Sequence, residues 1–128
     1  MENGKTDKKI LLFGFDDLRT ILEVKTAVEP FGAELIPVGR SGSGKTLAVL
    51  CGLEEDGEAS GGPVPGRMAV LYGLENDLDA LLPAMNAAGA NCLKAILTPH
   101  NRTWTPSRLY WELSREQEAI KAAQAKQP

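Results

Sequence analysis

Residues 98–104, TPHNRTW, gather the chain's single histidine with an asparagine, an arginine and a tryptophan. Histidine is suited to proton transfer near neutral pH, and arginine is suited to holding an anion. Polar groups of this kind beside an aromatic ring are typical of a small-ligand site. From this run we predict five ligand-binding residues: Thr98, His100, Asn101, Arg102 and Trp104.

The same run also has a structural interpretation. Asn101 would tie the turn through bonds from its side chain to the backbone, Trp104 would pack as a lid on the core, and His100 would be exposed. No carboxylate or nucleophile lies within the run to orient or use the histidine. We therefore predict no catalytic residue, and an enzyme is the less favoured class of protein.

Residues 39–46, GRSGSGKT, match the phosphate-loop pattern GxxxxGK[ST] at every position. In that motif the glycines let backbone amides wrap a phosphate, the lysine reaches the terminal phosphates, and the hydroxyl residue holds Mg²⁺. The motif also needs an aspartate at the end of another buried strand, and Asp16 is offset from the nearest strand by a Gly-Phe turn. Nucleotide binding is therefore only an alternative, with four predicted contact residues: Gly39, Gly44, Lys45 and Thr46.

The two cysteines, Cys51 and Cys92, are far apart in the sequence and show no CxxC spacing. With a single histidine besides, the chain offers too few ligands for a zinc site. We predict neither a metal site nor a cofactor, and we expect two reduced, half-buried thiols.

Four apolar runs of strand length lie at residues 8–13, 33–38, 68–72 and 93–97. Pro37 predicts an edge position for the second run, because proline cannot donate to a ladder of hydrogen bonds. A short helix is predicted near residues 46–53, and a last helix from Pro106 to about residue 122, with Thr105 as its cap.

Two longer helices are expected after the first and third strands. Asp16 is the predicted cap of the first helix and Asn76 that of the second. Pro83 would kink the second helix or delay its start. The residues expected to face the core in these helices are Leu18, Ile21, Leu22, Val28 and Phe31 in the first, and Leu78, Leu81, Leu82 and Met85 in the second.

Both halves of the chain repeat one plan of strand, glycine turn, acidic cap, helix, glycine and strand. Two tandem βαβ halves predict an α+β domain with a ferredoxin-like four-stranded sheet and a C-terminal helix. The alternative is a doubly wound parallel sheet, in which residues 39–66 form a third crossover. Only the parallel sheet would bring Asp16, residues 39–46, Glu75 and His100 to one cleft, and with them the carboxylate or cation that a site at His100 needs.

The expected domain organisation is a disordered lead at residues 1–7, a single domain at 8–122 with a mobile loop at 54–66, and a disordered tail at 123–128. The net charge of −3 and the pI of about 5.2 argue against a nucleic-acid or anionic-membrane partner. No apolar run approaches the roughly 18 residues of a membrane helix, and the polar N-terminus has no signal-peptide pattern. We expect a cytoplasmic protein.

The segment KAILTPHNRTW, followed by LxxEL, resembles the signature of the bacterial domain-of-unknown-function family DUF3783, and the preceding VLYGLENDLDALLPAM is similar to that family's strand, turn and helix. The resemblance covers about residues 67–120 and is weaker over the first half. It implies no particular activity, and it does not include a phosphate-binding loop. The matching residues are Lys94, Ala95, Thr98, Asn101, Trp104, Leu109, Glu112 and Leu113.

The sequence names no ligand. The favoured interpretation is a small non-enzymatic domain for protein interaction or small-ligand binding, with self-association as one possibility. Leu109, Leu113 and Ile120 form one stripe of the last helix, while Tyr110 and Trp111 project elsewhere as candidate interface anchors, unless Trp111 packs over a neighbouring helix. The alternatives are a nucleotide-binding protein that uses residues 39–46 and an anion-sensing regulatory domain.

Overall fold

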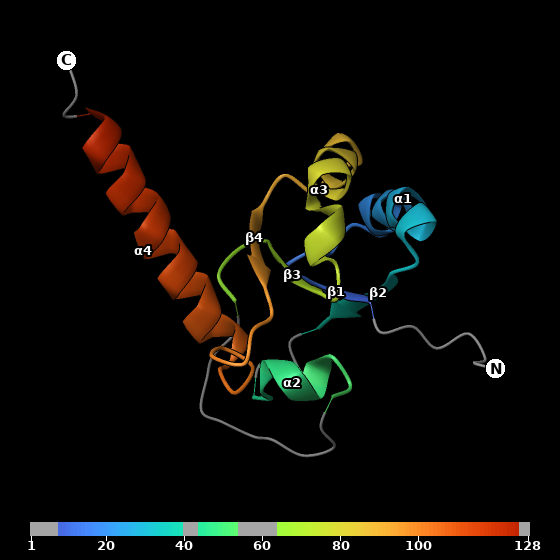
Figure 1. Cartoon of the computed structure of the whole chain (residues 1–128), viewed down its shortest axis with the longest axis horizontal. Helices are drawn as coiled ribbons and strands as arrows, with labels where there is room; N and C mark the ends of the chain where they lie inside the picture. Colours follow the sequence, from blue (N-terminus) through green and yellow to red (C-terminus); the bar gives the residue numbers. More distant parts are fainter. Residues whose placement is uncertain (1–7, 40–43, 54–63, 126–128) are drawn as a thin grey trace.

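The computed structural model describes residues 8–39, 44–53 and 64–125. Across these residues it contains four strands, four α-helices and two short 3-10 helices (Figure 1). In chain order these elements are β1 (Lys9–Phe13), α1 (Leu18–Val28), η1 (Glu29–Phe31), β2 (Glu34–Val38), α2 (Leu47–Leu50), β3 (Met68–Tyr72), η3 (Glu75–Asp77), α3 (Leu78–Ala87), β4 (Leu93–Ile96) and α4 (Pro106–Ala125).

The four strands form one sheet in the order β2-β1-β3-β4. Each half of the chain supplies a parallel pair, in which Ile10 is opposite Leu35 and Val70 is opposite Ala95. The two halves join through an antiparallel pairing of β1 with β3. The predicted α+β class, with tandem βαβ halves, a four-stranded sheet and a C-terminal helix, is confirmed. The predicted edge position of β2, which contains Pro37, is confirmed as well.

Two details of the predicted topology differ from the observed sheet. The doubly wound parallel alternative is wrong, because β1 and β3 run in opposite directions. A ferredoxin-like sheet would separate the two strands of each half by a strand of the other half, whereas here each half keeps its own strands paired. The long segment between β2 and β3, which carries α2, lets the chain pass to the far side of β1 instead of turning back as a hairpin.

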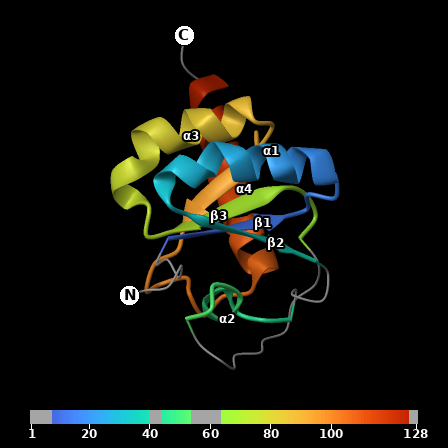
Figure 2. The ribbon, with the colours of Figure 1, turned by 90° about the vertical axis from the view of Figure 1, so that its right-hand side faces the viewer.

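Helices α1 and α3 lie together on one face of the sheet (Figure 2). The core on this face combines residues of β1 and β3, such as Leu12 and Leu71, with Val24 and Val28 of α1 and Met85 of α3. These α1 residues recur at helical spacing and are fully buried, so the helix faces the sheet with that stripe.

The predicted core face of α1 is wrong at two positions. Leu18 is 68% exposed and Leu22 is 51% exposed. At 3.6 residues per turn, both lie more than 100° around the helix from Val24, so the buried stripe runs from Ile21 through Val24 to Val28 instead. In α3 the predicted face is confirmed, because Leu81 and Met85 are buried while their partly buried neighbours Leu78 and Leu82 pack against the same cluster.

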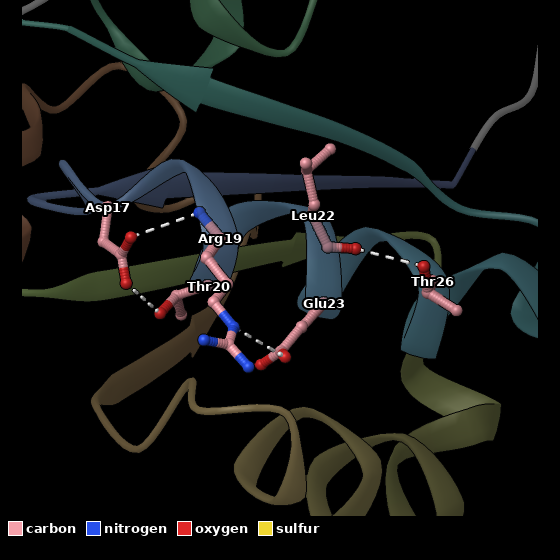
Figure 3. A network of polar contacts seen from close by, with 6 residues as sticks. All are labelled: Asp17, Arg19, Thr20, Leu22, Glu23 and Thr26. Carbon is pink, nitrogen blue, oxygen red and sulfur yellow. Dashed lines mark hydrogen bonds and ion pairs between the residues drawn. The ribbon is translucent and has the colours of Figure 1, made fainter.

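The caps of both helices also differ from the prediction. Asp17, not Asp16, caps α1: its carboxylate accepts hydrogen bonds from the backbone N–H of Arg19 at 3.1 Å and the hydroxyl of Thr20 at 2.8 Å (Figure 3). The bond from Thr20, followed by that from Arg19, lowers the pKa of Asp17. Asn76, the predicted cap of α3, lies within η3, and Pro83 lies inside α3.

The opposite face of the sheet is covered by α2 and the first half of α4 (Figure 2). Leu11 and Val70 of the sheet pack there with Leu47 and Cys51 from α2 and with Leu109 from α4. We call this group the second core cluster. Helix α4 stands beside β4, and its C-terminal half projects away from the body (Figure 1). The sheet is therefore the middle of three layers.

The predicted disordered lead and most of the predicted mobile loop, residues 54–63, lie outside the described residues. Of that loop, Val64 packs against the second core cluster. Helix α4 continues to Ala125, slightly beyond its predicted end near residue 122, and residues 126–128 of the predicted tail lie outside the described part of the chain. In the described part of the chain, no helix is both long enough and apolar enough to cross a membrane.

Gly14 and Gly32 provide a matched test of packing in this fold. Both have positive φ, at 78° and 73°, so alanine at either position adds about 1 kcal/mol of backbone strain. A Cβ at Gly14 would also collide with the carbonyl oxygen of Gly66, whereas nothing lies within 4 Å of one at Gly32. We expect Gly14→Ala to lower the free energy of unfolding in urea by at least about 2 kcal/mol more than Gly32→Ala. Equal losses would contradict the close contact between residues 14 and 66.

Candidate functional site

The turn after β4 is held together by the side chain of Asn101, which is only 8% exposed. Its Oδ1 accepts a hydrogen bond from the backbone N–H of Thr98 at 2.9 Å, and its Nδ2 donates to the carbonyl of Ile96 at 3.1 Å. In return, the backbone N–H of Asn101 donates to the hydroxyl of Thr98 at 3.2 Å. The predicted structural role of Asn101 is therefore confirmed, and its polar atoms are used within the turn.

His100 and Trp104 lie side by side at the surface of this turn. Their rings meet edge to face, with centroids 5.2 Å apart. The guanidinium of Arg108 lies 4.1 Å from the centroid of the Trp104 ring, in a cation–π contact. His100 is exposed, and Trp104 is half-buried against the second core cluster, as the structural interpretation of the sequence predicts.

The N-terminal end of α2 contacts the turn at residues 98–104. The backbone N–H of Leu47 donates to the carbonyl of Trp104, and that of Ala48 donates to the carbonyl of Arg102, both at 2.9 Å. The hydroxyl of Thr46 accepts a bond from the N–H of Val49 at 3.4 Å, and Thr46 is buried. The backbone N–H groups of Leu47, Ala48 and Val49 therefore already donate to acceptors within the protein.

This docking bears directly on the phosphate-loop pattern. In such a loop the amides at the start of the following helix face the phosphate, and the threonine hydroxyl faces Mg²⁺. Here two of those amides are occupied by carbonyls of residues 102 and 104, and the Thr46 hydroxyl caps α2. Lys45 is exposed, and residues 40–43 lie outside the described part of the chain. The geometry of residues 44–49 thus serves a structural contact.

A hollow of about 430 Å³ opens between the turn, β4 and α4. We call it the His100 hollow. Its lining combines three of the five predicted ligand-binding residues with apolar and acidic side chains. The residues that line it are Ala95, Ile96, His100, Asn101, Trp104, Leu109, Glu112, Leu113 and Glu116.

Two glutamates of this hollow were missed at the level of the sequence. The sequence argument expected a carboxylate near His100 only if a parallel sheet brought it from the other half of the chain. That expectation is wrong, because α4 turns back along β4 and supplies Glu112 and Glu116 itself. Their spacing of four residues, which puts them on one helix face, was the available signal. Of the other two predicted residues, Thr98 is half-buried and bonded to Asn101, and the carbonyl of Arg102 accepts from α2.

A second hollow, of about 660 Å³, lies at the carboxyl ends of β1 and β2. Asp16 and Gly39 line it together, beside Gly14, Gly66 and Pro106. The convergence of Asp16 with the start of residues 39–46 is therefore real, but His100 does not line this hollow. The antiparallel join between the halves separates the two places.

Neither cysteine shows the environment of a catalytic thiol. Cys51 is buried beneath the sheet, and burial raises its pKa to about 11. Burial also raises the pKa of the half-buried Cys92. Since the thiolate is the reactive form, both stay protonated near neutral pH. Within the residues that the structure describes, no three His, Cys, Asp or Glu side chains cluster as a metal site.

Comparison with known proteins finds one resemblance. Residues 68–120 match the model of a family described as a domain of unknown function, DUF3783. The predicted resemblance is confirmed over this stretch, which covers β3, α3, β4, the turn at residues 98–104 and most of α4. The match thus includes the whole lining of the His100 hollow and leaves out residues 39–46. No curated protein and no solved structure matches the chain.

The bonds of Asn101 predict a large loss of stability in Asn101→Ala. Without the side chain, the N–H of Thr98 and the carbonyl of Ile96 each lose a partner in a half-buried turn. We expect a loss of about 2 to 4 kcal/mol in the free energy of unfolding, measured in urea. Asn91→Ala is the matched control, since Asn91 is exposed and makes one bond to the carbonyl of Asn86. It should lose under about 0.5 kcal/mol, and similar losses in the two variants would refute a special role for Asn101.

The thiol environments predict unequal reactivity. Cys51 should react with a disulfide reagent far more slowly than Cys92, because it is fully buried and its pKa lies near 11. The measurement uses Cys92→Ala and Cys51→Ala, each of which leaves one thiol. The difference should disappear in denaturing urea. A native Cys51 that reacts as fast as the unfolded thiol would contradict its burial.

Proposed function

We propose that this chain is a small protein-interaction domain that associates with a second copy of itself through α4. The apolar stripe of that helix supports the proposal. Leu109 and Leu113 pack against the sheet, and Ile120 continues the same stripe with 57% of its surface exposed. Seven residues make close to two helical turns, so Leu113 and Ile120 point in nearly the same direction. The apolar side that packs α4 against the sheet therefore continues into the half of the helix that projects away from the sheet.

The length and charge of the projecting segment of α4 favour a second copy of this chain as its binding partner. From Arg115 to Ala123 every residue of α4 is exposed, and a helical segment of that length gains little stability in water without packing. Arg115 and Lys121 balance Glu116 and Glu118 in this segment. Two such helices would not repel each other, and an antiparallel pair would set opposite ends of their dipoles together.

The alternatives find less support. The occupied amides of α2 do not favour nucleotide binding at residues 39–46. The charged side chains of the His100 hollow include Glu112 and Glu116, which would repel an anion and so do not favour an anion sensor. The two free thiols fit a reducing compartment, which supports a cytoplasmic location for this interaction domain.

The dimer proposal predicts that two equally exposed residues of α4 differ in their effect on association. Ile120 and Trp111 are both 57% exposed, and their separation of nine residues is close to two and a half turns, which puts them on opposite faces. Burial of an isoleucine contributes about 2 kcal/mol, and a two-fold dimer contains the contact twice. Ile120→Ser should therefore raise the dimer dissociation constant by roughly two to three orders of magnitude. Sedimentation equilibrium measures that constant.

Trp111→Ser is the matched control for this measurement. Trp111 touches Tyr110 edge to face at 5.8 Å and lies off the stripe, so its removal should leave the dissociation constant within about threefold of the wild type. A wild-type chain that stays monomeric at millimolar concentration would end the proposal. A dimer that survives Ile120→Ser and is lost in Trp111→Ser would instead assign the interface to the opposite face, where the sequence first suggested an anchor.

A further inference from the structure

The described residues that line the His100 hollow carry more negative than positive charge. Among the described residues that line it, two are carboxylates, Glu112 and Glu116, and none is lysine or arginine. Two arginines outside the lining already have partners: Arg115 pairs with Glu112 at 2.7 Å, and Arg108 lies over the Trp104 ring. The local field of the lining therefore favours a positive charge.

The spacing of the two glutamates is unfavourable for the helix alone. Residues four apart lie on the same face of a helix, and like charges there destabilise it by a few tenths of a kcal/mol. Arg115 lies three residues after Glu112 and one before Glu116, and the structure shows its bond to Glu112. In the described residues no ion pair is seen for Glu116. A cation in the hollow would relieve the repulsion between Glu112 and Glu116.

The remaining walls suit a short hydrocarbon chain. Ala95, Ile96, Leu109 and Leu113 supply aliphatic surface, and Trp104 supplies an aromatic ring. Aromatic rings attract cations through their negative faces. The Arg108 guanidinium, 4.1 Å from the ring centroid, already occupies one face of Trp104, so the ring serves the hollow as apolar surface. The volume of about 430 Å³ lies within the usual range of small-molecule sites.

A bare metal ion fits this lining poorly. Metal sites with protein ligands need three or more donor side chains around the ion. Across residues 8–39, 44–53 and 64–125, no group of three His, Cys, Asp or Glu side chains is arranged to hold one. The apolar walls would also lie unused against a hydrated ion. The chemistry of the hollow points to a cation that carries its own hydrocarbon.

We infer that the His100 hollow binds a small primary alkylammonium ion, with the ammonium group at Glu112 and Glu116 and the alkyl chain against Leu109, Leu113 and the Trp104 ring. This inference rests on the hollow alone and does not depend on the association of α4 helices. Glu116 makes the larger contribution, because Glu112 already shares its charge with Arg115.

The two tryptophans allow a direct test by NMR. Their indole N–H signals report separately on Trp104, which lines the hollow, and on Trp111, which does not. The probes are pentylammonium, pentanol and pentanoate, which share one alkyl chain and differ in charge. Pentylammonium should shift the Trp104 signal and saturate in the millimolar range, and it should leave the Trp111 signal in place. Pentanol and pentanoate should bind more weakly, with pentanoate the weakest.

Two variants remove one charge each from α4. Glu116→Gln should weaken pentylammonium binding about fivefold, the effect of one partly solvated charge pair. Glu118→Gln is the matched control, because Glu118 lies outside the lining and should bind as the wild type does. Repeating both titrations in Ile120→Ser separates this inference from the state of association. The inference is overturned if pentylammonium and pentanol shift Trp104 equally, if no saturable shift occurs in either background, or if Glu118→Gln weakens binding as much as Glu116→Gln.

Discussion

The antiparallel pairing of β1 with β3 is the interaction on which the rest of the structure depends. It joins two βαβ halves whose strands run in opposite directions. Crossovers between parallel strands are right-handed, so two halves related by a rotation about the sheet normal carry both crossover helices on the same face, as α1 and α3 lie in Figure 2. The other face is then left apolar, with Leu11, Phe13, Met68 and Val70, and must be covered by segments outside the repeat.

Those segments are α2, the turn at residues 98–104 and α4, and they depend on one another. The first amides of α2 bind carbonyls of the turn, Asn101 holds the turn to the end of β4, and the turn leads into α4. This arrangement explains why a sequence with the pattern of a phosphate loop is used differently here. The donors that a phosphate would need already satisfy carbonyls in a half-buried contact, and freeing them would leave those acceptors without partners.

Helix α4 has two parts with different surroundings. Its first half completes the second core through Leu109 and forms a wall of the His100 hollow. Its second half extends beyond the sheet, and it carries Ile120 on the same stripe. The two proposals use these different parts: a small cation between α4 and β4, and a second chain along the projecting half. Glu116, which lines the hollow and is exposed, lies at the boundary between the two parts.

The sequence alone determined the elements, because they depend on local patterns. Apolar runs located the four strands, Pro37 marked the edge strand, Thr105 and Pro106 marked the start of α4, and the bonding role of Asn101 followed from its residue type. Errors arose where neighbouring choices have nearly equal local energies, as with Asp16 against Asp17 as a cap and with Leu18 and Leu22 against Val24 as the buried face of α1.

Only the tertiary structure decided strand direction and order, which depend on pairings between distant residues, and the composition of the His100 hollow. The carboxylates of the hollow come from α4, because that helix runs back along β4 after the turn. The direction in which a helix continues after a turn cannot be predicted from the periodicity of the sequence.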